Sequence, residues 1–178
     1  MKVIFLDIDG VLNGYNWYTY FLFRIIRLLH LFELWHKYYD TFDVKRKYAR
    51  RLSTICKKTG AKIVISSSWR GGWYIPYEEK SKRQKSLEDN INRFHLEVIG
   101  ITPKDKDSKR GKEISQWLSE HPEVDRFIIL DDEKFDMMEF YGKELIITST
   151  NGDIKGLPYE NTGLKRKHVK QAIKILNS

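Results

Sequence analysis

Two pairs of aspartates have the residue type and spacing that metal-assisted phosphate chemistry requires. Asp7 and Asp9 follow one short apolar run, and Asp131 and Asp132 follow another. Side chains two residues apart on a strand share a face, so Asp7 and Asp9 are expected to converge on one site. Adjacent carboxylates such as Asp131 and Asp132 repel each other unless a cation lies nearby. Because oxygen ligands that share a site with phosphate suit Mg²⁺, the two pairs together predict a magnesium centre.

Each pair also has a simpler interpretation. The dipeptide Asp9-Gly10 is common in turns, and Asp131 or Asp132 can cap the helix that follows. Two acidic strand ends within one sheet favour the metal site over these explanations, because the carboxyl ends of parallel strands meet at one edge.

A serine run, Ser66-Ser67-Ser68, ends a further apolar stretch and is followed by Arg70. Hydroxyl groups and a guanidinium are suitable donors to phosphate oxygens, so we interpret Ser66 as a phosphate-binding hydroxyl, with Ser67 and Arg70 as supporting contacts. A serine nucleophile is the competing interpretation. The chain has no Gly-x-Ser-x-Gly elbow, however, and none of its five histidines has the spacing of a base. Serine runs at strand ends are also ordinary turn sequences.

Two basic side chains begin a predicted helix between the serine run and the second acidic pair. Arg110 and Lys112 lie in the segment Lys109-Arg110-Gly111-Lys112-Glu113. A helix N-terminus and a cation both attract phosphate. Either residue is therefore a candidate to neutralise the transferred group, whereas Lys109 is interpreted as a solvated turn residue.

These residues must be positioned by a sheet, because most of them follow short apolar runs. Five such runs are typical of strands buried on both faces: 2–6, 61–65, 96–101, 126–130 and 144–148. Helical periodicity lies between and after them, at 44–58, 81–94, 111–120, 133–141 and 164–176. The alternation predicts an α/β fold with a five-stranded parallel sheet flanked by helices. Thr59-Gly60 and a capping box of Ser86 with Asp89 are expected to mark helix borders.

The segment 13–40 does not fit this alternation. Its apolar centre, residues 20–32, is interrupted by Arg24, Arg27 and His30, and these residues argue against a transmembrane span. We predict a lid or cap helix packed against its own domain, with a membrane-surface helix or a protein contact as alternatives.

The composition predicts one soluble domain spanning residues 1–178. The 32 Lys and Arg exceed the 24 Asp and Glu, which favours anionic, phosphate-bearing partners. Cys56 is the single cysteine, so no disulfide can form within the chain and an inert buried thiol is expected. The N-terminal run leads directly into Asp7 and leaves no room for a secretory segment, which predicts a cytoplasmic protein.

Taken in order, these signals resemble the signature of the haloacid dehalogenase (HAD) superfamily: Asp-x-Asp-Gly-Val at 7–11, a strand-end serine at 66, a basic residue that opens a helix, and Asp131-Asp132. The fuller wording Leu-Asp-Ile-Asp-Gly-Val-Leu-Asn at 6–13, Ser-Ser-Ser-Trp-Arg at 66–70 and Arg-Gly-x-Glu-Ile at 110–114 is similar to HAD domains of the Swiss Army Knife RNA-repair type. The resemblance covers most of the chain and implies a Rossmann-like HAD fold, in which 13–40 is a small helical cap or flap inserted after the first strand.

The resemblance also implies a Mg²⁺-dependent phosphatase that acts through an aspartyl-phosphate. Asp7 would be the nucleophile, and Asp9 would be first the acid and then the base. The Asp7 carboxylate, the Asp9 backbone carbonyl and Asp131 would hold the Mg²⁺, with Asp132 close by or acting through water. The phosphoryl oxygens would be gripped by Ser66 and Arg110, with support from Ser67, Arg70 and Lys112. The basic residue of the family is usually lysine, so Lys112 stays an alternative to Arg110.

The substrate is expected to be a nucleotide or the terminal phosphate of a nucleic acid. Basic clusters at 45–51, 80–85, 104–112 and 165–174 could form a track for a nucleic-acid backbone. Charged helix faces are usually only solvated, however. Alternatives are a phosphatase of a small non-nucleotide metabolite, a non-catalytic nucleic-acid-binding module, and a phospho-accepting receiver domain. The receiver is disfavoured because its acceptor normally follows the third strand, and here the run 96–101 ends without an acid.

Overall fold

A computed structural model of the chain describes residues 1–14, 25, 26, 29, 43–107, 109–134, 136–149 and 163–178. Its centre is a five-stranded parallel sheet in the order β3-β2-β1-β4-β5. The strands are β1 (Lys2–Leu6), β2 (Lys62–Ile65), β3 (Val98–Ile101), β4 (Arg126–Asp131) and β5 (Leu145–Ile147). The predicted α/β, Rossmann-like class is confirmed.

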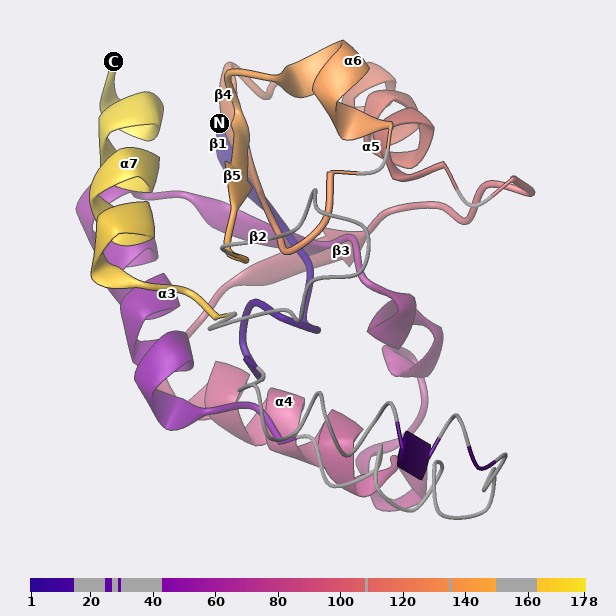
Figure 1. Ribbon diagram of the computed structural model, residues 1–178. Coiled ribbons are helices and arrows are strands. Elements are labelled where there is room, and N and C mark those ends of the chain that lie inside the picture. The colour runs from indigo at the N-terminus through magenta and orange to yellow at the C-terminus, as the bar shows by residue number, and fades with distance from the viewer. Residues whose placement is uncertain (15–24, 27–28, 30–42, 108, 135, 150–162) are drawn as a thin grey trace.

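Helices connect the strands and cover both faces of the sheet (Figure 1). They are α3 (Arg46–Thr59), α4 (Lys82–Arg93), α5 (Arg110–Ser119), α6 (Met137–Tyr141) and α7 (Arg166–Asn177), with short 3-10 turns at η1 (Ser68–Gly72) and η2 (Tyr77–Glu79). Each predicted helix is present, and α6 is the shortest. It begins later than the expected residue 133 because the backbone N–H of Glu133 donates to Asp131 Oδ1 and makes a turn there.

The two faces of β1 explain the layers. Ile4 and Leu6 point into one core, which α3, α4 and α7 cover, whereas Val3 and Phe5 point into a second core under α5 and α6. Side chains alternate between the faces of a strand, so a strand buried on both faces must be apolar throughout. For this reason the short apolar run at 2–6 predicted a strand buried on both faces.

Two helix borders test the cap predictions. Gly60 ends α3 in the left-handed conformation, with a φ of 70°, as the Thr59-Gly60 signal indicated. The capping box predicted at Ser86 with Asp89 is wrong, since the box at the start of α4 is made by Ser81 and Gln84. Ser86 lies inside the helix, where its hydroxyl accepts from the backbone N–H of Val44 at 3.2 Å.

The predicted cap at 13–40 falls almost entirely outside the described residues, and it stays a prediction. Among the residues that the structure describes, no helix has the length and apolar character needed to cross a bilayer.

Candidate active site

The carboxyl ends of the central strands carry the predicted site residues. The hydrogen-bond ladder continues past β1, because Asp7 N donates to Leu130 O at 2.9 Å and Ser66 N donates to Leu6 O at 2.9 Å. Asp7 and Ser66 therefore directly follow β1 and β2, Asp131 is the last residue of β4, and all three lie at the same level of the sheet. The topology places ligands of an open parallel sheet at this edge.

Three aspartates converge there. Asp7, Asp131 and Asp132 each offer one carboxylate oxygen, and these oxygens lie within 4.8 Å of one another. Asp7 is 4% exposed and Asp131 is fully buried. An all-oxygen donor set of this kind suits a hard divalent cation such as Mg²⁺. The residues present thus fit the cation that the sequence predicted.

Burial makes the three carboxyl groups of this cluster difficult to ionise. The pKa of Asp7 is raised well above its ordinary value, first by burial and then by the charge of Asp131. Burial also raises the pKa of Asp132, with the charges of Asp7 and Asp131 adding to it. The pKa of Asp131 is raised by burial as well, although Arg110 opposes the rise. A cation bound among the three would favour their ionised forms.

Of the two predicted basic residues, Arg110 reaches the cluster. Its Nη1 lies 3.0 Å from Asp7 Oδ1, and the same atom pairs with Asp131 Oδ2. Burial lowers the pKa of Arg110, but the neighbouring charges of Asp131 and Asp7 outweigh burial and raise it. Arg110 is the first residue of α5, so the start of that helix brings the guanidinium to the strand ends. Lys112, the alternative, is exposed on α5.

Gly10 permits the close approach of the two acidic pairs. Its φ is +67°, and a Cβ built on it would lie 2.0 Å from Asp132 Oδ2. The Thr148 hydroxyl donates to Gly10 O at 2.9 Å, and the Ser149 hydroxyl donates to Asp132 O at 2.8 Å. The residues after β5 thus hold the backbones of both acidic segments. The glycine in the Asp9-Gly10 dipeptide is required by this contact as well as by the turn.

The match to a known family agrees with this geometry. A family described as the HAD domain in Swiss Army Knife RNA repair proteins matches residues 3–155. The chain belongs to this family. Comparisons with curated proteins and with solved structures gave no significant match. Family membership supports a phosphatase-like function of the HAD type, and the matched range includes all three clustered aspartates.

The carboxylate of Asp9 in this HAD domain accepts hydrogen bonds from two side chains. Its Oδ1 accepts from Asn13 Nδ2 at 2.7 Å, and its Oδ2 accepts from Trp69 Nε1 at 2.9 Å. Asn13 Oδ1 also accepts from the N–H of Gly10 at 2.8 Å. The carboxylate of Asp9 is therefore oriented by a side chain from the loop after β1 and by another from η1. The predicted contact of its backbone carbonyl with Mg²⁺ stays a prediction.

The hydroxyl groups of Ser66 and Ser67 have different surroundings. Ser66 is fully buried, and its hydroxyl has no hydrogen-bond partner within the described part of the chain. Ser67 is also buried, and its hydroxyl accepts from Trp69 N at 3.5 Å. Hydrogen bonding by this side chain lowers the pKa of Asp7, although burial and the charge of Asp131 outweigh that effect. A buried hydroxyl without a partner is costly, so a ligand oxygen at this position would satisfy Ser66.

Arg70 contacts Glu113 in this HAD domain, and its predicted supporting contact to phosphate stays a prediction. Its guanidinium donates to both carboxylate oxygens of Glu113, at 2.8 and 2.7 Å, and to Thr102 Oγ1 at 3.1 Å. The sequence analysis did not identify Glu113 as a site residue. Its only signal was its place in the Arg-Gly-x-Glu-Ile wording, three residues after Arg110.

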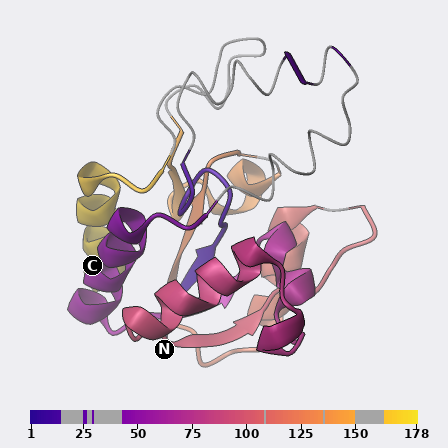
Figure 2. The same cartoon turned by 90° about the horizontal axis from the view of Figure 1, so that it is seen from below.

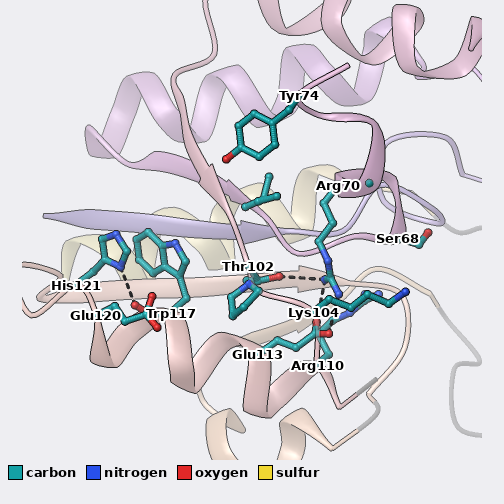
Figure 3. Close-up of a pocket in the computed structure, with 13 residues that line it drawn as sticks. Ser68, Arg70, Tyr74, Thr102, Lys104, Arg110, Glu113, Trp117, Glu120 and His121 are labelled. Carbon is teal, nitrogen blue, oxygen red and sulfur yellow. Dashed lines mark hydrogen bonds and ion pairs between the residues drawn. The ribbon is translucent and has the colours of Figure 1, made fainter. Parts of the chain in front are cut away.

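A pocket of about 780 Å³ adjoins this site. Figure 3 shows Arg70, Lys104 and Arg110 toward one end of it and Trp117 and His121 toward the other, with Tyr74 across from them. Arg110 thus contributes both to the acidic cluster and to the pocket. Tyr74 is 79% exposed, and the rings of Trp117 and His121 stack with centroids 3.6 Å apart.

Proposed function

We propose that this HAD domain is a Mg²⁺-dependent phosphomonoester hydrolase whose nucleophile is Asp7, and that its substrate is a nucleotide or the terminal phosphate of a nucleic acid. The observation that carries the proposal is the convergence of Asp7, Asp131 and Asp132 around Arg110 at the carboxyl edge of the sheet. Family membership supports the same chemistry.

The first chemical step forms an aspartyl-phosphate. An oxygen of Asp7 attacks phosphorus while the bond from phosphorus to the leaving oxygen breaks, and Asp9 gives its proton to that oxygen. Water then attacks the aspartyl-phosphate, Asp9 takes the proton from the water, and the bond between Asp7 and phosphorus breaks. Inorganic phosphate and the unchanged carboxylate of Asp7 result.

Positive charge makes the attack of one anion on another feasible. Asp7, Asp131 and Asp132 would hold Mg²⁺, which when bound supplies charge that lowers the repulsion between the carboxylate and the phosphate. Arg110 adds a second positive group in direct contact with Asp7. The guanidinium can transfer its hydrogen bonds to phosphoryl oxygens once a substrate is present.

The serines contribute uncharged donors. The hydroxyl of Ser66, which has no partner among the described residues, is suited to a phosphoryl oxygen, and Ser67 next to it favours the ionised form of Asp7. Trp69 and Asn13 fix the carboxylate of Asp9 for proton transfer. Arg70 supports the phosphate site indirectly, since its contacts to Glu113 join η1 to α5, and Lys112 stays a predicted supporting contact.

The nucleotide part of the proposal rests on the adjoining pocket. Lys104 and Arg110 at one end of this pocket suit the phosphate of a nucleotide, and the exposed ring of Tyr74 across the pocket is a surface on which its base could stack.

Release of inorganic phosphate from end-phosphorylated oligonucleotides, nucleotides and sugar phosphates, with and without Mg²⁺, tests the function. We expect turnover that requires Mg²⁺ and favours the nucleotide substrates.

Asp7→Asn should lower the rate roughly a thousandfold or more, because the amide is not a nucleophile, while circular dichroism shows an unchanged fold. The exposed Asp107 provides the matched control Asp107→Asn, which should keep the wild-type rate. Wild-type turnover by Asp7→Asn would refute the nucleophile assignment.

A further inference from the structure

We propose that α3 and α7 together form a docking surface for the phosphate backbone of a single-stranded nucleic acid. The proposal rests on the proposed function, because it names the class of substrate that the phosphatase would receive. The surface comprises the two helices with the lysine that precedes each of them, residues 45–59 and 165–177, and is called the basic helix pair below.

The basic helix pair contains cations and no carboxylate. Its twelve basic residues are Lys45, Arg46, Lys47, Arg50, Arg51, Lys57, Lys58, Lys165, Arg166, Lys167, Lys170 and Lys174. The whole chain has 32 Lys and Arg against 24 Asp and Glu. Removing these twelve leaves 20 basic against the same 24 acidic residues, so the rest of the chain has a net negative charge. These two segments, which have no acidic residue, thus carry more positive charge than the net +8 of the whole chain.

The two helices are neighbours although more than a hundred residues separate them in the sequence. They lie side by side in both views (Figures 1 and 2) and share one core through Leu52 and Ile55 of α3 and Ala172 and Leu176 of α7. Arg51 Nη1 also donates to Leu164 O at 2.8 Å, just before α7. Two of the basic clusters predicted from the sequence, 45–51 and 165–174, therefore belong to one surface.

Among the described residues, no carboxylate pairs with the cations of the basic helix pair. Within the described ranges, none of the twelve cations forms an ion pair, whereas Lys62, Lys80 and Arg110 elsewhere do. The first turns of both helices have no acidic residue. Cations there face the positive end of the helix dipole and repel one another, which destabilises the free protein. Only Lys57, Lys58 and Lys174 lie in last turns, where the dipole favours them.

The basic helix pair begins beside the candidate active site. Lys45 N donates to Leu12 O at 2.8 Å, and Leu164 N donates to Val11 O at 2.9 Å. Val11 and Leu12 closely follow Asp9 in the loop after β1. A chain of phosphates lying along the pair can therefore reach the edge of the sheet where its terminal phosphate would be hydrolysed. A polymer of phosphodiesters is the polyanion that supplies both the repeated charge and the terminal group.

Binding of a fluorescein-labelled single-stranded RNA of about 12 nucleotides, followed by anisotropy between about 50 and 200 mM KCl, tests the surface. The variant Arg46→Gln, Lys47→Gln, Arg166→Gln removes three exposed cations of the pair. The control Lys82→Gln, Arg93→Gln, Lys106→Gln removes three exposed cations outside it. We expect the first variant to weaken binding at least about tenfold and to reduce the salt slope by about 2, since each lost phosphate contact contributes about 0.7. The control should stay within about twofold of wild type.

Any of three outcomes would contradict the proposed docking surface. The wild-type protein could fail to bind RNA, the two variants could lose the same affinity, or the protein could bind only to vesicles of anionic phospholipid. DNA of the same sequence, run in parallel, shows whether the backbone phosphates suffice. Mg²⁺-dependent release of phosphate from p-nitrophenyl phosphate is measured on the same samples and should be unchanged in both variants. RNA binding that depends on the basic helix pair, without any phosphate release, would refute the proposed function and support the docking surface. Phosphate release without RNA binding would refute the docking surface and support the proposed function.

Discussion

At the scale of single residues, Gly10 determines how closely the two acidic strand ends approach. A Cβ at this position would lie 2.0 Å from Asp132 Oδ2 and 2.5 Å from Asp132 Cβ, so a methyl group must displace the Asp132 side chain. For Gly10→Ala we predict a loss of Mg²⁺ affinity of roughly tenfold or more, because one of three carboxylates leaves the cluster. Titration of Mg²⁺ against the melting temperature measures this affinity.

Gly60→Ala separates the clash from backbone strain. Gly60 has a φ of +70°, nearly that of Gly10, but a Cβ there would meet no atom within 4 Å. Both variants should lose about 1 kcal/mol from the left-handed conformation, and only Gly10→Ala should lose Mg²⁺ affinity. Equal Mg²⁺ affinities in the two variants would show that Asp132 does not need its present position.

At the scale of elements, the pair of Arg70 and Glu113 joins η1 to α5. Both side chains are largely buried, and Glu113 Oε1 also accepts from the backbone N–H of Asp105 at 3.0 Å. Arg110 lies one helical turn before Glu113, so the pair fixes the end of the helix that brings Arg110 to Asp7. The pocket in Figure 3 runs along this junction.

For Glu113→Gln we predict a loss of about 3 kcal/mol in the free energy of unfolding, because Arg70 keeps a buried charge without its carboxylate partner. Urea denaturation measures the loss. Glu97→Gln is the control, since Glu97 pairs with Lys62 at the surface and is 61% exposed, and its loss should stay below about 1 kcal/mol. If both substitutions cost the same, the buried pair is not what holds η1 against α5.

The sheet was predictable because strands buried on both faces must be continuously apolar. Each of the five apolar runs contains the strand that forms, apart from Asp131, which extends β4 by one residue. Helix starts were less predictable, since several side chains compete to cap a helix. Ser81 and Ser86 both precede a suitable partner by three residues, and tertiary structure decides between them. Ser86 is inside the helix and bonds to Val44 of another segment.

The candidate site was predictable where topology alone places a residue. Asp7, Ser66 and Asp131 end adjacent strands, and Arg110 opens a helix at the same edge, so order and spacing were sufficient. The supporting residues were not predicted. Trp69, Thr148 and Ser149 act through contacts across the fold, and no local spacing reports such contacts. Asp132 was predicted as a site residue, but the close approach of its side chain to Gly10 was not predicted.

At the scale of the whole molecule, charge is divided between two adjoining regions. The acidic cluster is buried, and burial together with the repulsion between its carboxylates raises the pKa of Asp7 and Asp132. The basic helix pair is exposed and begins at the loop after β1. A polyanion would be attracted by the helices and repelled by the cluster until a divalent cation reverses the local charge. Mg²⁺ would therefore control both the chemistry and the final approach of the phosphate.

The pH dependence of the stability of the whole fold should show whether Mg²⁺ binds to the acidic cluster. Burial raises the pKa of Asp7, Asp131 and Asp132 in the folded protein, so without Mg²⁺ the folded state binds more protons than the unfolded state. Their contribution to stability is complete below the ordinary pKa of 3.8 and is lost as the pH rises through the raised values. Mg²⁺ binds the ionised carboxylates, so the stabilisation it gives should grow with pH.

Thermal melts at a fixed excess of Mg²⁺, compared with melts in a chelator, test this between about pH 5 and 8. At a Mg²⁺ concentration of about 100 times the dissociation constant, the gain should reach about 2.7 kcal/mol at the upper end and shrink toward acid. In Asp7→Asn the gain should be smaller at every pH, because the cluster has lost one ionisable ligand. A Mg²⁺ gain that is the same across the whole range would mean that protons and Mg²⁺ do not compete for these carboxylates. The cation would then have to bind elsewhere, and the acidic strand ends could not be the metal centre.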